Sequence, residues 1–118
     1  MSGIIQLPGG IYVETWNLAL EEGNLPEGAM TEVSIYGRPV LLLRVREVFY
    51  ALDGRCPHLG CPLARGTFKD GIITCPCHDW RFYAATGRFV DAPEIGVAIH
   101  KVRVTGDSVF VSLNDKGP

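Results

Sequence analysis

Two short motifs in the middle of the chain hold the residues best suited to bind a metal. They read CPH (residues 56–58) and CPCH (residues 75–78), and sixteen residues separate them. All four cysteines of the 118-residue chain fall between positions 56 and 77, beside two of its three histidines. Thiolate and imidazole are common ligands of zinc and iron. The clustering therefore indicates a metal site before it indicates the disulfide framework of a secreted protein.

The spacing within each motif predicts which side chains act together. In an extended segment the side chains at i and i+2 lie on the same side, so Cys56 and His58 can converge on one centre. Around a tight turn positions i and i+3 can meet, so Cys75 and His78 can do the same. Cys77 lies between them and is expected to point elsewhere. We predict the metal ligands to be Cys56, His58, Cys75 and His78.

A CxH loop followed by a CxxH loop resembles the Rieske [2Fe-2S] proteins, in which two cysteines hold one iron and two histidines hold the other. The resemblance is carried by CPHLGCPL, ITCPCH and WRFYAATGRF, and it covers residues 55 to about 93. The flanking segments PVLLLRVREVFYAL and KVRVTGDSVFVSL fit the scaffold of the family as well. The resemblance implies one [2Fe-2S] cluster per chain, held in a loop-rich subdomain at about residues 55–93.

A structural zinc site remains an alternative at this point. Zinc also takes two cysteines with two histidines, or four cysteines, within a small fold. Zinc fingers usually place two cysteines in one loop and two histidines in another, whereas each loop here is mixed. The mixed loops therefore favour the iron–sulfur interpretation.

The resemblance also implies a redox role and a range of potentials. The oxidised cluster with neutral imidazoles sums to zero charge, whereas an all-cysteine cluster begins at −2, so histidine ligation raises the potential to roughly −150 to +300 mV. High-potential members have a serine and a tyrosine whose hydroxyls donate to the cluster sulfurs. This chain has Trp80 and Phe82 at those positions, so we expect a potential below that of the respiratory proteins.

Other positions match parts of the family's cluster loops. Gly60 allows the first loop to turn tightly, and Pro93 occupies the place of a proline loop that covers the cluster. Cys61 and Cys77 match positions that carry a disulfide in the respiratory and photosynthetic Rieske proteins, which implies a bridge between the two loops. The alternative is that both remain free thiols, because disulfides are rare in a reducing cytosol.

The rest of the sequence predicts an all-β scaffold. Apolar residues alternate with polar ones, as at residues 101–104, and turn signals such as Asp-Gly and Gly-Asp separate the segments. The apolar run at residues 39–45 is typical of a central strand, paired with residues 48–52 across a tight turn. Only residues 16–22 are a helix candidate. His100 lies in an alternating strand and is expected to be a surface or internally satisfied histidine. We predict a Rieske-like antiparallel β sandwich or barrel.

Composition limits the kinds of partner. At 118 residues we expect residues 1–118 to form a single domain. The net charge is −2 and the eleven basic residues are scattered, so nucleic acid is not an expected partner. The sequence has neither a signal-peptide pattern nor a membrane-span pattern, so we expect no membrane partner and a cytoplasmic protein.

Together with the resemblance, these features imply a soluble Rieske-type ferredoxin. It would carry one electron at a time between a reductase and a terminal oxidoreductase such as an oxygenase, and would not catalyse a reaction alone. The alternative is a small Rieske subunit of a larger oxidoreductase, resembling those of arsenite oxidase or nitrite reductase. A zinc-binding structural module is a further alternative.

Overall fold

The computed structural model describes residues 5–7, 11–13 and 15–114, and within them the chain is built almost entirely of strands. Two single-turn 3-10 helices are present, η1 (Glu22–Asn24) and η2 (Leu63–Arg65). The strands are β1 (Ile5–Leu7), β2 (Ile11–Val13), β3 (Asn17–Glu21), β4 (Met30–Ile35), β5 (Arg38–Val45), β6 (Val48–Asp53), β7 (Thr67–Lys69), β8 (Ile72–Thr74), β9 (Arg81–Tyr83), β10 (Ile99–Thr105) and β11 (Ser108–Ser112).

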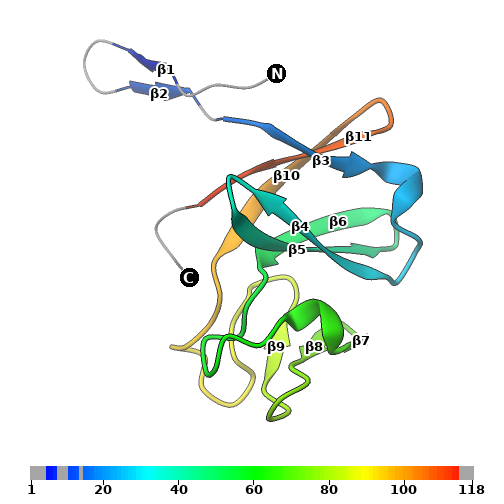
Figure 1. Cartoon of the computed structure of the whole chain (residues 1–118), viewed down its shortest axis with the longest axis vertical. Helices are drawn as coiled ribbons and strands as arrows, with labels where there is room; N and C mark the ends of the chain where they lie inside the picture. The colour runs from blue at the N-terminus through cyan, green and yellow to red at the C-terminus, as the bar shows by residue number, and fades with distance from the viewer. Residues whose placement is uncertain (1–4, 8–10, 14, 115–118) are drawn as a thin grey trace.

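The largest sheet has six strands in the order β3-β11-β10-β6-β5-β4, with every neighbouring pair antiparallel. Its two edge strands, β3 and β4, contact each other, so the sheet curls into a nearly closed barrel. A separate sheet, β7-β8-β9, lies below the barrel in Figure 1. The predicted all-β antiparallel architecture is confirmed.

Strand β5 explains the apolar run at residues 39–45. Val40 and Leu42 face the interior of the barrel, whereas Leu41 and Leu43 face the small sheet and its loops, and all four side chains are fully buried. Because both faces of β5 are covered, the strand cannot alternate between apolar and polar residues. The predicted pairing with β6 is confirmed, with Val45 opposite Val48.

The helix candidate at residues 16–22 does not form a helix. Residues Asn17–Glu21 form strand β3, which pairs with β11, and the chain turns only at Glu22–Asn24. The segment is too short to be stable as an isolated helix. Pairing with β11 provides hydrogen-bond partners for its backbone N–H and C=O groups instead.

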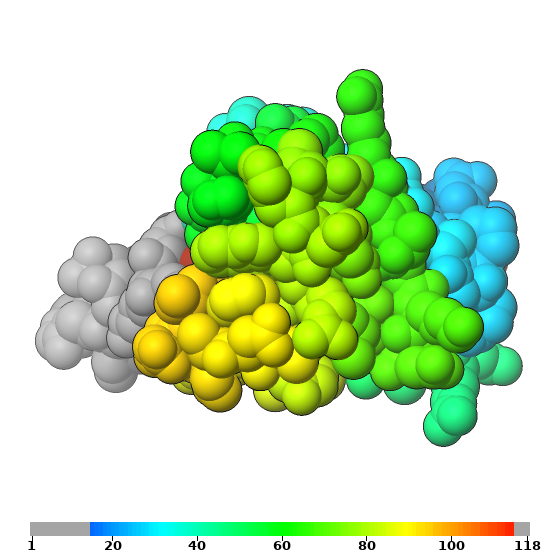
Figure 2. All heavy atoms as spheres, turned by 90° about the horizontal axis from the view of Figure 1, so that it is seen from below, coloured from blue at the N-terminus to red at the C-terminus, as the bar shows by residue number. Residues whose placement is uncertain are grey.

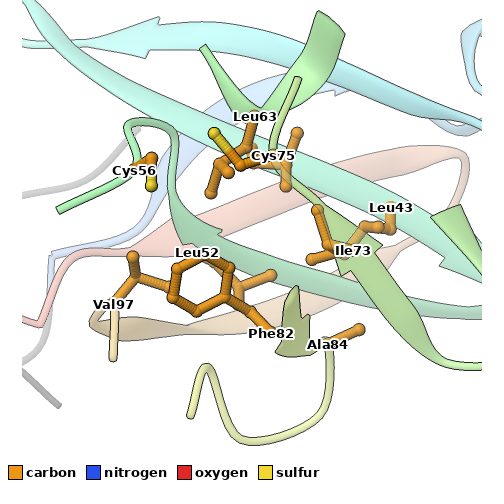
Figure 3. Close-up of a cluster of buried hydrophobic side chains, with 10 residues drawn as sticks. Leu43, Leu52, Cys56, Leu63, Ile73, Cys75, Phe82, Ala84 and Val97 are labelled. Atoms are coloured by element: carbon orange, nitrogen blue, oxygen red, sulfur yellow. The ribbon is translucent and has the colours of Figure 1, made fainter. Parts of the chain in front are cut away.

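The small sheet and the barrel share one hydrophobic core (Figure 3). Leu52 and Leu43 come from the barrel, and Ile73 and Phe82 come from β8 and β9. Each of these four side chains is fully buried. The small sheet is therefore fixed on the barrel, and the loops that leave it have a rigid base.

A buried histidine joins β10 to β6 where β6 leads toward the small sheet. The backbone N–H of Asn114 donates to Nδ1 of His100 over 2.9 Å, so the ring proton is on Nε2, which donates to Asp53 over 3.0 Å. Arg38 also donates to Asp53, at 3.1 Å. His100 is thus internally satisfied, which is one of the two expected possibilities.

Asp53→Asn should lower the free energy of unfolding at neutral pH by roughly 1–3 kcal/mol, because it removes the charged partner of both His100 and Arg38. Burial raises the pKa of Asp53, but the hydrogen bond from His100 and the charge of Arg38 outweigh it, so the pKa lies below its usual value. The stabilisation is therefore present above the unfolded-state pKa and is lost as the pH falls through the folded-state pKa. Denaturant titrations of both proteins at neutral and acid pH should converge at acid pH. An equal difference at every pH would contradict this account.

Candidate metal centre

The first cysteine–histidine loop, residues 56–61, is a closed turn. The backbone N–H of Cys56 donates to the carbonyl of Cys61 at 2.9 Å, and the N–H of Gly60 donates to the carbonyl of Cys56 at 2.8 Å. Gly60 has a φ of 75°, a left-handed conformation that glycine adopts without steric cost. Gly60 therefore has the role that the sequence predicted for it.

The second loop, residues 75–80, has the same backbone pattern. The N–H of Cys75 donates to the carbonyl of Trp80 at 2.7 Å, and the N–H of Asp79 donates to the carbonyl of Cys75 at 3.2 Å. Asp79 occupies the position of Gly60 and also has a left-handed backbone, with a φ of 57°. The two loops are two copies of one turn, each opening on a Cys-Pro pair.

This pattern corrects the reasoning that placed Cys56 and His58 on one side of an extended segment. Residues 57–59 form a turn, just as residues 76–78 do. Counted from the first cysteine, the histidine is the third residue of the first loop and the fourth residue of the second. The different spacings therefore come from different positions on one kind of turn.

The structure brings Cys56 and Cys75 together as a buried pair of thiols. Their exposed fractions are 3% and 1%, and both side chains belong to the core shared by the barrel and the small sheet (Figure 3). Burial raises the pKa of Cys56 and the neighbouring Cys75 raises it further, against the lowering effect of the backbone N–H groups of His58 and Leu59. Two adjacent thiolates at this depth need a cation to stabilise them.

The predicted histidine ligands form a second pair, at the surface. His58 and His78 are both exposed, and their ring centroids lie 4.9 Å apart with an edge-to-face angle of 74°. The four predicted ligands therefore fall into a buried sulfur pair and an exposed nitrogen pair, each with one member from each loop.

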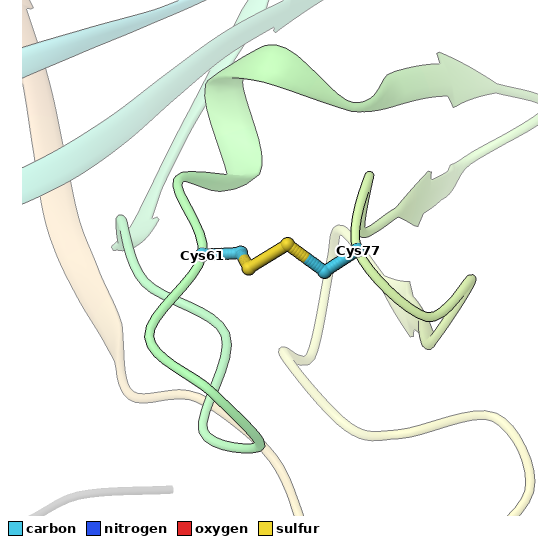
Figure 4. Close-up of a disulfide and its surroundings, with 2 residues drawn as sticks. All are labelled: Cys61 and Cys77. Carbon is cyan, nitrogen blue, oxygen red and sulfur yellow. A yellow bond between two sulfur atoms is a disulfide. The ribbon is translucent and has the colours of Figure 1, made fainter.

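Cys61 and Cys77 lie at disulfide distance from each other, one on each of the two loops (Figure 4). Their Cα atoms are 6.4 Å apart, within the range of natural disulfides. The sulfurs of Cys61, Cys75 and Cys77 also lie within 4.8 Å of one another, which makes them a competing metal-binding set. Two sulfurs that are bonded to each other cannot serve as thiolate ligands, so this set requires the Cys61–Cys77 bond to be absent.

The donor set fits a cluster with mixed ligands. A two-iron cluster of the mixed type needs two thiolates and two imidazoles, and each of the two pairs supplies one kind of donor. Among the described residues, Cys56 and Cys75 are free cysteines, so both are available as thiolate ligands. The two imidazoles are exposed at the surface, where a partner molecule can approach them.

A third segment, residues 88–96, lies beside the two loops. Figure 2 shows all three on one face, with the first loop in green, the second in yellow-green and residues 88–96 in yellow. Pro93 is exposed in this segment, and its carbonyl accepts a hydrogen bond from Arg88 at 3.0 Å. The segment thus lies on the same face as the ligand loops, and the covering role of Pro93 stays a prediction.

Aromatic rings form the layer below the histidines. Trp80 stacks on His58, with centroids 4.5 Å apart, and Phe89 stacks on the indole of Trp80 at 4.4 Å. Phe82 is fully buried beneath them. The sequence predicted that Trp80 and Phe82 lie beside the cluster, but it did not predict that Phe89 joins them. The only signal was its place in the WRFYAATGRF segment, where no spacing points to a contact with Trp80.

Within the described residues, the structure has no helix that is long and apolar enough to cross a bilayer.

Comparisons with known proteins point to one family. The family model of the Rieske [2Fe-2S] domain matches residues 15–111. The human protein apoptosis-inducing factor 3 is 36% identical over 90 residues, which cover 75% of this chain but only 15% of that protein. The chain therefore spans a small part of that relative.

Two ferredoxins are similar over nearly their whole length. The ferredoxin component of the naphthalene 1,2-dioxygenase system of Pseudomonas aeruginosa is 30% identical over 102 residues, covering 86% of this chain and 98% of that protein. The solved structure of the ferredoxin of carbazole 1,9a-dioxygenase from Nocardioides aromaticivorans IC177 superposes with a TM-score of 0.78 at 26% identity. That superposition covers 84% of this chain and 98% of the other.

Proposed function

The chain belongs to the Rieske [2Fe-2S] family, and on that basis we propose that it is a ferredoxin that carries one electron from a reductase to a terminal oxidoreductase such as an oxygenase. The observation that carries the proposal is the division of four ligand-type residues into a buried thiol pair and an exposed imidazole pair. Two relatives of nearly the same length are ferredoxins of dioxygenase systems, which supports an oxygenase as the acceptor.

We propose that Cys56 and Cys75 hold one iron of a single [2Fe-2S] cluster and that His58 and His78 hold the other. When bound, such a cluster accepts and releases one electron. The thiol pair and the histidine pair then have different roles. The buried thiols exclude water from the inner side, and the exposed histidines give a partner protein a short path to the site.

The docking face in this proposal is the apolar rim around the histidines. Leu59 is 62% exposed, and Pro57, Pro76 and Pro93 are exposed around it. A small apolar rim suits the brief, weak contacts of electron-transfer partners. We further propose that residues 1–118 form one Rieske domain, in which about residues 55–93 bind the cluster. We place the protein in the cytoplasm.

The test is iron and acid-labile sulfide analysis, followed by EPR of the dithionite-reduced protein during a potentiometric titration. We expect two irons and two sulfides per chain and a rhombic signal whose average g lies below the free-electron value. A colourless protein with stoichiometric zinc would instead support the structural zinc module. Persistent co-purification with a large subunit would favour a bound subunit over a free carrier.

The midpoint potential should lie in the lower part of the Rieske range, which runs from roughly −150 to +300 mV. Trp80 and Phe82 carry no hydroxyl that could donate to a cluster sulfur, and donors of that kind raise the potential. The potentiometric titration of the wild-type protein measures this directly. A midpoint near the top of the range would refute the argument from missing hydroxyls and leave the ligand assignment intact.

We also propose that Cys61 and Cys77 form a disulfide in the mature protein, because their sulfurs lie at bonding distance. The double variant Cys61→Ser/Cys77→Ser should then lower the free energy of unfolding by about 3 kcal/mol, the value for a closed loop of this length, 16 residues. Denaturant titrations with and without a reductant measure the loss. A wild-type protein that is equally stable in both conditions, and equal to the double variant, would show that the thiols are free.

A further inference from the structure

We propose that Trp80 is a positioning residue, which holds the ring of His58 in the orientation of a metal ligand by stacking against it. This inference rests on the proposed function, because it assigns a role relative to the same cluster. Its observation is a column of three nearly parallel rings, His58, Trp80 and Phe89. The angles between neighbouring planes are 8° and 12°, and the centroid distances are 4.5 and 4.4 Å.

The ring of His58 needs an external restraint. The imidazole of a histidine rotates about a broad torsional minimum, so its backbone alone does not fix the ring plane. Metal-binding histidines are usually held by a hydrogen bond to the second ring nitrogen. In the part of the chain that the structure describes, no hydrogen bond reaches either ring nitrogen of His58. The indole face is therefore the restraint that this chain supplies.

The column has a rigid base. The carbonyl of Trp80 accepts the N–H of Cys75 at 2.7 Å, which fixes the tryptophan backbone to a ligand loop. Phe89 is held by its backbone N–H, which donates to the carbonyl of Ile95 at 2.9 Å, and by contact with the fully buried Phe82. Each ring of the column comes from a different loop. The ring of His58 is therefore held in place, through Trp80 and Phe89, by contact with the buried core.

The restraint is specific to one of the two histidines. Among the described residues, Trp80 stacks on His58, and the only ring that contacts His78 is that of His58 itself, edge to face. If stacking orients the ligand, then removing the indole changes one coordinated nitrogen and leaves the other as it was. A general loosening of the fold would change both.

The test compares Trp80→Leu, which removes the ring, with Trp80→Phe, which keeps a flat ring of smaller area. Trp16→Leu is the matched control, since Trp16 is the other tryptophan of the chain and contacts Arg103 on β10 instead. The readouts are the ¹⁴N hyperfine couplings of the reduced protein, measured by pulsed EPR, and the midpoint potential. We expect two resolved couplings in the wild type, in Trp16→Leu and in Trp80→Phe. In Trp80→Leu one coupling should shift or broaden while the other keeps its wild-type value, and the midpoint potential should shift.

Unchanged couplings in a fully loaded Trp80→Leu protein, or equal changes in both, would overturn the inference. If Trp80→Leu does not retain the cluster, Phe89→Leu is the variant that tests the inference. It leaves the indole of Trp80 in place and removes only the ring that stacks beneath it. A smaller change in the same single coupling then supports the stack, and no change overturns it. Absence of any nitrogen coupling in the wild type would instead defeat the proposed function, so the two failures are distinguishable.

Discussion

Cys56→Ala should abolish the visible absorption and the reduced EPR signal of the protein, whereas Cys61→Ser/Cys77→Ser should keep both. This is the expected result because Cys56 belongs to the buried pair with Cys75, while Cys61 and Cys77 lie at disulfide distance from each other. Losing one of two thiolate ligands leaves an iron without a complete set of donors, so we expect loss of the iron. Iron and sulfide content, with the absorption spectrum, measures the result.

This pair of variants also separates the two possible sulfur sets. The competing set consists of Cys61, Cys75 and Cys77, whose sulfurs lie within 4.8 Å of one another, and it does not include Cys56. If that set held the metal, Cys56→Ala would keep its iron and the double serine variant would lose it. That outcome would refute the proposed ligand assignment. Both proteins need circular dichroism spectra like that of the wild type for the comparison to count.

Phe82→Ala should lower the free energy of unfolding by about 3–5 kcal/mol, the usual cost of removing a fully buried phenylalanine ring. The ring is 0% exposed and packs in the core shared by the barrel and the small sheet (Figure 3). It also lies beneath Phe89 and Trp80, with ring centroids 5.7 and 6.4 Å away. The substitution therefore leaves a cavity directly below the ligand loops. Urea or guanidinium titration of the wild type and the variant gives the difference.

Tyr83→Ala is the control for this prediction. Tyr83 is the next residue on β9 and points the other way, with 44% of its surface exposed. Its loss should cost far less, since exposed substitutions usually change stability by about 0.5 kcal/mol or less. Equal losses for the two variants would show that the burial of Phe82 is not what stabilises the small sheet.

The structure gives the two ligand loops different contacts in spite of their common backbone turn. In the first loop the residue that closes the turn is Cys61, which lies at disulfide distance from Cys77 of the other loop. In the second it is Trp80, which stacks on a histidine of the first. Each loop therefore restrains the other through its closing residue. This arrangement explains why we expect losses at Cys61 and at Trp80 to differ, since one lowers stability and the other alters a single ligand.

The amino-acid sequence by itself determined the chemistry and the kind of scaffold. The types, order and spacing of Cys56, His58, Cys75 and His78 indicated a mixed-ligand cluster, and alternating apolar residues with frequent turn signals indicated antiparallel strands. These features are local, because a ligand type and a strand period are properties of short segments. The all-β fold is confirmed, and the ligand assignment stays a prediction that the variants above test.

Only the tertiary structure decided the features that depend on contacts between distant segments. Residues 17–21 became a strand because the edge of β11 was available to pair with them. Arg46 and Glu47 both adopt the left-handed backbone of a two-residue hairpin turn between β5 and β6, and the carboxylate of Glu27 stabilises this turn by accepting their N–H groups. The stack of Phe89 on Trp80 joins two loops in the same way. The physical reason is common to all three: the stabilising partner lies outside the local segment, so no local pattern encodes it.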